Sequence, residues 1–177
     1  PANAATNISA SNATVSWSAA AGATSYRVEL LNSPTDITPL QSRTGITGTS
    51  VSFNGLNGTT TYHWRVTAVN TVGTAVSQTR SFTTAALAVP VLTSPANGAT
   101  RISRTPTLRW NTTGTLAYDI QVSTSSNFTS PLQLSSATTS VVVSQTLLSR
   151  TRYFWRVRSK NNASTGAWSA SRSFTTL

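Results

Sequence analysis

The chain has no cysteine and no methionine, and among its 177 residues there are only three acids and one histidine. Without cysteine, the sequence excludes disulfides, thiolate metal sites and cysteine nucleophiles. The absence of both sulfur-containing residues agrees with an oxidising compartment. Because carboxylates are so scarce, acid-pair catalysis and a calcium site of clustered carboxylates have almost no side chains to use.

Long apolar runs are also missing. No stretch approaches the roughly 18 residues of a membrane span, and no signal peptide is recognisable. Since the sequence does not begin with methionine, we expect a mature fragment or an excerpt of a longer protein. What the chain has instead is hydroxyl groups, because serine and threonine make up roughly a third of it. Such a surface is common in secreted β proteins, so we expect an extracellular or cell-surface location.

An internal repeat organises the chain. TTYHWRVTAVN at 60–70 returns as TRYFWRVRSKN at 151–161, and TRSFTT at 79–84 returns as SRSFTT at 171–176. PANAAT at the start returns as PANGAT at 95–100. The order is kept throughout, which indicates a duplicated unit of about 90 residues. We therefore predict two domains, residues 1–86 and 87–177.

Within each unit the pattern is that of short strands. SYRVELL at 25–31 and TYHWRVTAV at 61–69 alternate apolar and polar side chains, and turn signals such as NGLNG at 54–58 separate such segments. Period-two alternation is typical of strands with one buried face, and no helical period is present. About seven such strands in each unit predict a β-sandwich.

These residues resemble the fibronectin type III family, and the resemblance covers nearly all of both units. It rests on an early tryptophan, a short Tyr-x-Val/Ile strand, the Tyr-x-Trp-Arg-Val strand and the closing Ser-Phe-Thr-Thr. The fold it implies is all-β, with two tandem immunoglobulin-like sandwiches. It also implies that the tyrosine of Tyr-x-Trp makes a corner hydrogen bond, and that the leucine preceding it is Leu56 in one unit and Leu148 in the other. The structural core residues expected in this way are Trp17, Tyr62, Trp64, Trp110, Tyr153 and Trp155.

The first unit departs from this pattern at its start. The second unit has VPVLTSPANGAT, a whole strand before the shared PAN, and the first unit has no counterpart of that strand. The simplest interpretation is an excerpt from a longer array of such units. The alternative is that a neighbouring chain supplies the strand to an open sheet edge.

Few residues of the chain could act in catalysis or bind a metal. Glu29 and Asp119 fall on strands of separate units, too far apart for the roughly 5–10 Å of a glycosidase acid pair. We expect exposed ion pairs instead, Glu29 with Arg65 and Asp119 with Arg156. His63 points outward and has no nearby acid, which does not suit a triad or a metal site. We predict no enzyme activity, no cofactor and no metal.

Charge separates the two units. Residues 1–86 carry four arginines and two acids, a net of +2, whereas residues 87–177 carry nine cations and one acid, a net of +8. Alternation along 152–160 predicts a cationic stripe on one strand face, and Arg109 extends it if the strand order allows. Three interpretations of this stripe remain open. It contacts a polyanion, it contacts a protein partner, or its arginines stack for purely structural reasons. The stripe residues are Arg152, Phe154, Arg156, Arg158, Lys160 and Arg109.

Trp168 has two interpretations of the same kind. It either covers the edge of the core or forms a platform for a glycan. The first unit has Val76 near that position, so the fold does not require a tryptophan there.

The leading functional hypothesis is a non-catalytic extracellular structural or adhesive module of a repeat array or filament. Its partners would be other copies or neighbouring domains of the same protein. One alternative is an accessory module of a secreted enzyme that binds an acidic glycan or another polyanion. Another is a phage virion fibre or decoration protein. Bacterial secreted and surface proteins, and some phage virion proteins, contain units that resemble these.

Overall fold

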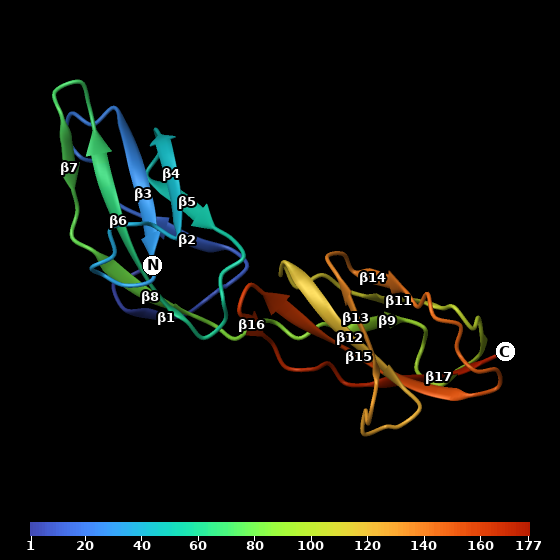
Figure 1. Ribbon diagram of the computed structural model, residues 1–177. Coiled ribbons are helices and arrows are strands. Elements are labelled where there is room, and N and C mark those ends of the chain that lie inside the picture. Colours follow the sequence, from blue (N-terminus) through green and yellow to red (C-terminus); the bar gives the residue numbers. More distant parts are fainter. The chain divides into compact units, whose positions relative to one another are not determined.

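The computed structural model describes residues 1–177, and all of its regular elements are β-strands (Figure 1). The predicted all-β class is therefore confirmed. The structure contains no helix that could cross a membrane. The chain divides into two compact units, Pro1–Ala86 and Leu87–Leu177.

The first unit is a sandwich of two sheets. The larger sheet has the order β1-β8-β6-β3-β4, with β7 beside the second half of β6, and the smaller sheet consists of β2 and β5. Its eight strands are β1 Ala5–Ile8, β2 Ala13–Ser16, β3 Ser25–Leu31, β4 Gln41–Ile46, β5 Ser50–Phe53, β6 Thr61–Val69, β7 Thr74–Val76 and β8 Arg80–Thr84.

The second unit repeats this plan with one strand more. Its larger sheet has the order β10-β17-β15-β12-β13, with β16 beside the end of β15, and its smaller sheet has the order β14-β11-β9. Its nine strands are β9 Leu92–Ser94, β10 Ala99–Ile102, β11 Thr107–Trp110, β12 Ala117–Ser123, β13 Leu132–Ser136, β14 Ser140–Val142, β15 Arg152–Asn161, β16 Ser164–Thr165 and β17 Arg172–Thr176.

One pairing in each larger sheet is parallel. β1 lies parallel to β8 and β10 lies parallel to β17, whereas the neighbours of β6 and β15 are antiparallel to them. The strand near the start of each unit is thus hydrogen-bonded to the strand at its end.

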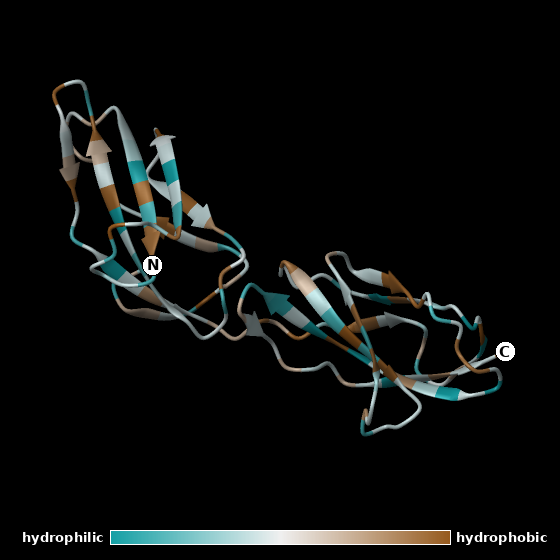
Figure 2. Cartoon of the chain, viewed as in Figure 1, coloured by the Kyte–Doolittle hydropathy of each residue, from teal (hydrophilic) through white to brown (hydrophobic).

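Alternation along the strands builds the core of each unit, as the change of colour along β3, β6 and β12 shows (Figure 2). Trp64 and Trp155, the central residues of β6 and β15, are 3% and 0% exposed. The early tryptophan of each unit meets a tyrosine edge to face, with centroid distances of 5.4 Å for Trp17–Tyr26 and 5.3 Å for Trp110–Tyr118. Edge-to-face aromatic pairs of this kind add to the packing of the sandwich.

A tyrosine holds the corner before the long central strand of each unit. The backbone N–H of Asn57 donates to the Tyr62 hydroxyl at 2.9 Å, and that of Leu148 donates to the Tyr153 hydroxyl at 3.0 Å. These equivalent bonds make Leu148 the counterpart of Asn57. The prediction that Leu148 corresponds to Leu56 is wrong, because the buried counterpart of Leu56 is Leu147, which is 5% exposed, whereas Leu148 is 64% exposed. The one-residue shift turns the side chain of Leu148 away from the core.

The smaller sheets differ between the units. β9 pairs with β11 in the second unit, whereas in the first unit β2 pairs only with β5. The consequence is visible at equivalent tryptophans, because Trp110 is 3% exposed whereas Trp17 is only half-buried. The first unit therefore leaves one edge of β2 open.

Candidate functional site

The outward face of β15 carries a row of cationic and aromatic side chains. Alternate residues of this strand are buried, and those between them remain at least partly exposed. Positions two apart repeat about every 6.6 Å along a strand, so these side chains are neighbours. We call the following residues the cationic ladder: Arg152, Phe154, Arg156, Arg158 and Lys160 of β15, with the flanking rings of Phe128 and Trp168.

Arg156 lies at the centre of the cationic ladder. Its guanidinium carbon is 4.0 Å from the ring centroid of Phe128 and 4.6 Å from that of Trp168. Its Nε donates to Oε1 of Gln121 at 2.8 Å. Burial among these groups, and then the neighbouring charge of Arg158, lower the pKa of Arg156. Stacking and hydrogen bonding thus fix this guanidinium in one position.

Trp168 contacts two guanidinium groups of the cationic ladder. The guanidinium carbon of Arg158 lies 4.6 Å from its ring centroid, the same distance as that of Arg156. The indole is partly buried against this face. A sugar would stack only on the ring surface that these two groups leave free.

Val76 holds the position of Trp168 in the first unit. The neighbouring serines show the equivalence, since Ser77 Oγ accepts from the N–H of Val66 and Ser169 Oγ accepts from that of Val157. Val76 is 61% exposed. The tryptophan is therefore a feature of the second unit's surface, not of the shared fold.

Asp119 is the one carboxylate beside the cationic ladder. Its Oδ2 accepts from Nε and Nη2 of Arg158 at 3.0 and 2.9 Å, and its Oδ1 lies 3.5 Å from Nζ of Lys160. The predicted pair of Asp119 with Arg156 is wrong. The register places Asp119 opposite Arg158, and it places Gln121 opposite Arg156.

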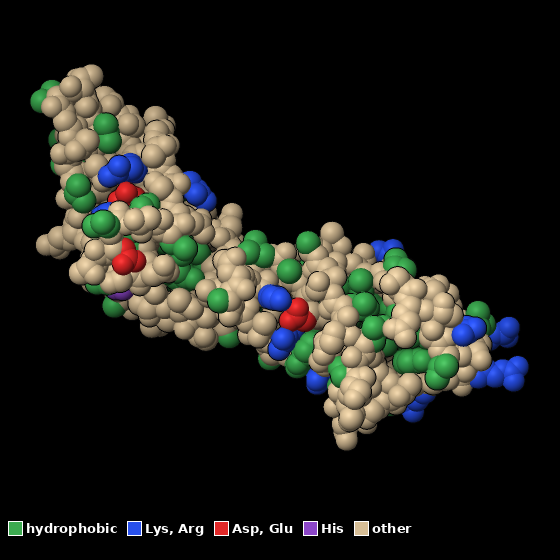
Figure 3. Space-filling view, in the orientation of Figure 1, with side chains coloured by type: hydrophobic (Ala, Val, Ile, Leu, Met, Phe, Trp, Pro, Cys, Tyr) green, Lys and Arg blue, Asp and Glu red, His purple; other side chains and the backbone are tan.

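The charge of the cationic ladder is largely uncompensated. Asp119 is the only acid of the second unit, and it pairs with Arg158 and Lys160. The other two cations of the ladder, Arg152 and Arg156, bond to uncharged partners, Ser173 and Gln121. Figure 3 shows blue basic side chains at several places over the second unit, where red acidic colour is scarce. The face is therefore suited to an anionic partner.

The two remaining cations of the predicted stripe, Arg152 and Arg109, lie on different sheets. The guanidinium carbon of Arg152 lies 5.1 Å from the ring centroid of its neighbour Phe154, and Nη2 donates to Ser173 Oγ at 3.1 Å. Arg109 does not extend the stripe, contrary to the prediction. It lies on β11, in the smaller sheet, whereas β15 belongs to the larger sheet. The strand order separates the two faces.

The first unit has a nearly neutral version of the same face. Arg65 Nε donates to Oε2 of Glu29 at 2.7 Å, which is the predicted pair, and Arg27 Nε lies 3.5 Å from Oε1. Glu29 is only 6% exposed, so this pair is not the fully exposed one expected. His63 takes the position of Phe154 and is partly buried.

The carboxylates of the chain all hold structural contacts. Glu29 and Asp119 are ion-paired along the strands, and Asp36 Oδ2 accepts from the N–H of Ser33 at 3.0 Å in a turn. No group of three or more potential metal ligands gathers in the structure.

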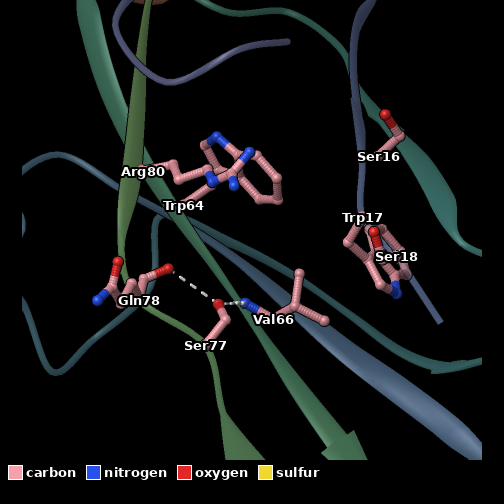
Figure 4. Close-up of a pocket in the computed structure, with 8 residues that line it drawn as sticks. All are labelled: Ser16, Trp17, Ser18, Trp64, Val66, Ser77, Gln78 and Arg80. Atoms are coloured by element: carbon pink, nitrogen blue, oxygen red, sulfur yellow. Dashed lines mark hydrogen bonds between the residues drawn. The ribbon is translucent and has the colours of Figure 1, made fainter. Parts of the chain in front are cut away.

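A second candidate site is an open groove of about 600 Å³ in the first unit. Figure 4 shows its two walls, with the segment after β2 on one side and residues of β6, β8 and the β7–β8 link on the other. The only sign of this groove in the sequence is that the first unit has no counterpart of PVLTS, residues 90–94. The lining residues are Ser16, Trp17, Ser18, Trp64, Val66, Ser77, Gln78 and Arg80.

Comparison with known families gives a match for each unit. Residues 1–84 match the family described as Fibronectin type III domain, and residues 96–176 match the family described as Rha78A-like, N-terminal immunoglobulin domain. No curated protein matches the chain. Fibronectin type III domains are structural and binding modules, in general non-catalytic, and they typically occur in extracellular or surface proteins.

Solved tandem-domain structures are similar at low identity. The FN1–FN3 domains of chicken CNTN1 align over 98% of this chain and 62% of their own length, with 18% identity and a TM-score of 0.43. A two-domain fibronectin type III segment of chicken tenascin aligns over 96% of this chain and 95% of its own length, with 14% identity and a TM-score of 0.47.

Both TM-scores lie below 0.5, so the assignment rests on the strand topology and the family matches. The chain is thus a tandem of two immunoglobulin-like β-sandwich domains, the first of which matches the fibronectin type III family and the second an immunoglobulin-domain family.

Proposed function

We propose that the chain is a non-catalytic, extracellular structural or adhesive module that acts through protein–protein contacts in a repeat array or surface filament. The observation that carries the proposal is the tandem of two similar β-sandwiches, the first of which matches the fibronectin type III family. In such a fold, function lies in the sites that the strand faces and loops present. A module of this kind contacts its neighbours through those surfaces.

The use of the carboxylates supports the non-catalytic part. A general acid or base must be free to exchange a proton with a substrate in a cleft. Glu29 and Asp119 are each held between two cations on a strand face, and Asp36 closes a turn. These side chains stabilise strands and turns.

The test compares the chain with a closed variant, in which residues 88–94 are joined in front of Pro1. Residues 95–100 and 1–6 correspond, so the added segment has the spacing that it has in the second unit. Light scattering and negative-stain imaging should show dimers or filaments for both chains, because an array held by its own contacts does not depend on the edge of β2 that the added strand covers. Monomers in both cases, or association of the unmodified chain alone, would contradict an assembly role.

A second candidate function has its own observation. The cationic ladder carries four cations and only one neighbouring carboxylate, Asp119, which pairs with Arg158 and Lys160. This excess of positive charge supports an accessory module that binds an acidic glycan or another polyanion. The family name matched by residues 96–176 describes an N-terminal domain, which fits a module that precedes others in a longer protein.

Retention on an anionic polysaccharide column tests this second function. Arg156→Glu with Arg158→Glu should elute at lower salt than the unmodified chain, because phosphate- or sulfate-type contacts are replaced by repulsion. The control is Arg43→Glu with Arg109→Glu, which makes the same change in net charge outside the sheet of the cationic ladder, on β4 of the first unit and on β11 of the smaller sheet. Equal losses for both pairs would mean that net charge alone, and no particular site, retains the chain.

A further inference from the structure

We infer that the cationic ladder binds a linear polymer of phosphodiester-linked polyol units, which lies along β15 and is recognised through the spacing of its phosphate groups. The inference deepens the second proposed function, on which it rests, because it names the class of polyanion and the way in which it binds. The order of the cations, the side chains that hold them and the nearly neutral face of the first unit all support it.

The cations of the cationic ladder form a single row along one strand. Arg156, Arg158 and Lys160 occupy alternate positions of β15, and Arg152 lies at the other end of the row, beyond Phe154. Neighbouring positions of this kind repeat about every 6.6 Å. Such a row suits a partner whose anionic groups also follow one another along a line at this interval.

The guanidinium groups at the centre of the row are held in place by the protein itself. Arg156 stacks on the rings of Phe128 and Trp168. Arg158 contacts Trp168 and donates to Asp119 through Nε and Nη2. Side chains that are already fixed lose less conformational entropy on binding, and they set the interval between the two charges.

The outer nitrogens of Arg156 point to the type of anion. The hydrogen bond of this guanidinium is made by Nε, which donates to Oε1 of Gln121, so Nη1 and Nη2 are left for a ligand. Two N–H groups on a planar fork match two oxygens of a phosphate. Burial, and then the charge of Arg158, lower the pKa of Arg156, and a phosphate between the two groups relieves their repulsion.

The aromatic rings of the cationic ladder offer little open surface to a sugar or a base. Phe128 is 8% exposed and has a guanidinium over its ring. Trp168 contacts two guanidinium groups, and Phe154 has that of Arg152 at 5.1 Å from its ring centroid. Proteins that hold single-stranded nucleic acid stack its bases on open aromatic rings. The face therefore favours a polymer that is bound through its charged groups.

A phosphodiester chain with one glycerol unit between successive phosphates fits the length of the row. Each of its repeats contains as many backbone bonds as two residues of a polypeptide, so the two chains advance by similar intervals when extended. The next strand carries uncharged polar side chains on the same face, with Ser135 opposite Asp119 and Gln133 opposite Gln121. Such side chains can bond to the hydroxyl groups of a polyol and add no negative charge.

The first unit shows how one residue neutralises this face. Arg65 holds the position of Arg156, because each follows the central tryptophan of its strand. Glu29 lies opposite Arg65, whereas Gln121 lies opposite Arg156. The second unit thus has an amide where the first unit has the carboxylate that binds its central arginine.

The direct test is titration of the full chain with four polymers at equal charge concentration and ionic strength: poly(glycerol phosphate), polygalacturonate, a sulfated polysaccharide and oligothymidylate. Calorimetry gives the affinities, and the indole N–H signal of Trp168 in NMR spectra reports contact with the cationic ladder. Poly(glycerol phosphate) should bind roughly tenfold more tightly than either polysaccharide, because its phosphates match the row. It should bind at least as tightly as oligothymidylate, since the bases find no open ring.

A matched pair of variants makes the test specific. Gln121→Glu places the carboxylate of the first unit beside Arg156 and should weaken binding of poly(glycerol phosphate) roughly tenfold, because it pairs with the guanidinium and repels phosphate. The fold should be retained, since Glu29 is accommodated at the same position of the first unit. Gln145→Glu, at an exposed residue of the link between β14 and β15, makes the same change in net charge and should leave binding nearly unchanged. Circular dichroism checks that both variants are folded.

The inference and the second function fail in different ways. Equal effects of the two substitutions, or an unmoved Trp168 signal, would overturn the inference. Tighter binding of oligothymidylate would make single-stranded nucleic acid the partner instead. A polysaccharide that binds as tightly as poly(glycerol phosphate) would also overturn the inference, while an accessory role toward glycans would stand. A chain that binds none of the four polymers would contradict the second function itself.

Discussion

Tyr62 and Tyr153 each hold a corner of the sandwich through one hydroxyl group. The N–H groups of Asn57 and Leu148 donate to them, and both rings are largely buried, with Tyr62 2% and Tyr153 7% exposed. Burial raises the pKa of Tyr62, and the hydrogen bond from Asn57 offsets part of this effect. The fold therefore favours the neutral hydroxyl.

Tyr62→Phe should lower the free energy of unfolding by about 0.5–1.5 kcal/mol, the usual contribution of one hydrogen bond. It should also change the response to pH. Since the folded state raises the pKa of Tyr62, its contribution is fully present below the ordinary tyrosine pKa of about 10 and is lost as pH rises through the raised value. Urea unfolding between pH 7 and 11 should show a smaller alkaline loss for the variant. Parallel curves would contradict the assignment.

The two early tryptophans give a matched pair of core substitutions. Trp110→Ala should cost about 3–5 kcal/mol, the usual range for a buried large aromatic residue. Trp17→Ala should cost clearly less, because one side of Trp17 lies along the open groove. Chemical denaturation of both variants measures the difference, and equal losses would mean that Trp17 is covered in solution.

At the scale of the strand, both faces of β15 make contacts. Its inward residues fill the core, and two of its outward cations, Arg156 and Arg158, stack on the rings of Phe128 and Trp168. Exposed cation–π contacts contribute roughly 0.5–1 kcal/mol each. The stacking therefore orders the cations at a modest gain in stability.

Trp168→Val replaces this residue with its counterpart from the first unit. Loss of contacts with Arg156 and Arg158 should lower the unfolding free energy by about 1–2 kcal/mol, with the fold retained because Val76 serves at the same place. Denaturation monitored by circular dichroism checks the loss. Global unfolding would show instead that Trp168 is a core residue.

Alternation and repetition were enough to predict the strands, the sandwich and the outward row of β15, because a buried face imposes period two on the sequence. Registers were harder. Asp119 pairs with Arg158 and not Arg156 because cross-strand partners depend on where the intervening turns end. Leu148 was predicted where the structure has Leu147 for the same reason, because the chain is shifted by one residue before the corner.

The order of strands was also beyond the sequence pattern. Whether Arg109 lies beside β15 depends on which sheet receives β11, and local alternation is the same in either sheet. The stacking of Arg156 between Phe128 and Trp168 brings together residues from distant segments. Trp17 is half-buried because β2 pairs only with β5, whereas β11 also pairs with β9. The residues around Trp17 do not indicate this difference.

At the scale of the whole molecule, each unit has a core of its own. The core cluster of the second unit is made of residues from Leu92 to Phe174, and Phe53, Tyr62 and Phe82 are buried within the first. Trp155→Ala should therefore destabilise the second unit by about 3–5 kcal/mol and leave the first unit's stability unchanged. Hydrogen exchange resolved by peptide measures the two units separately. A shared loss of protection would show that they unfold as one.

The parallel pairing of β1 with β8 has a mechanical consequence. Ala5 lies opposite Phe82 and Ile8 opposite Thr84, and the second unit repeats this with β10 and β17. When the two ends of the first unit are pulled apart, these strands are drawn past each other along their length. Their hydrogen bonds then bear the load together, because shear does not open them one at a time. Under tension such a unit should hold until the whole pair slips, which is the behaviour required of a tether.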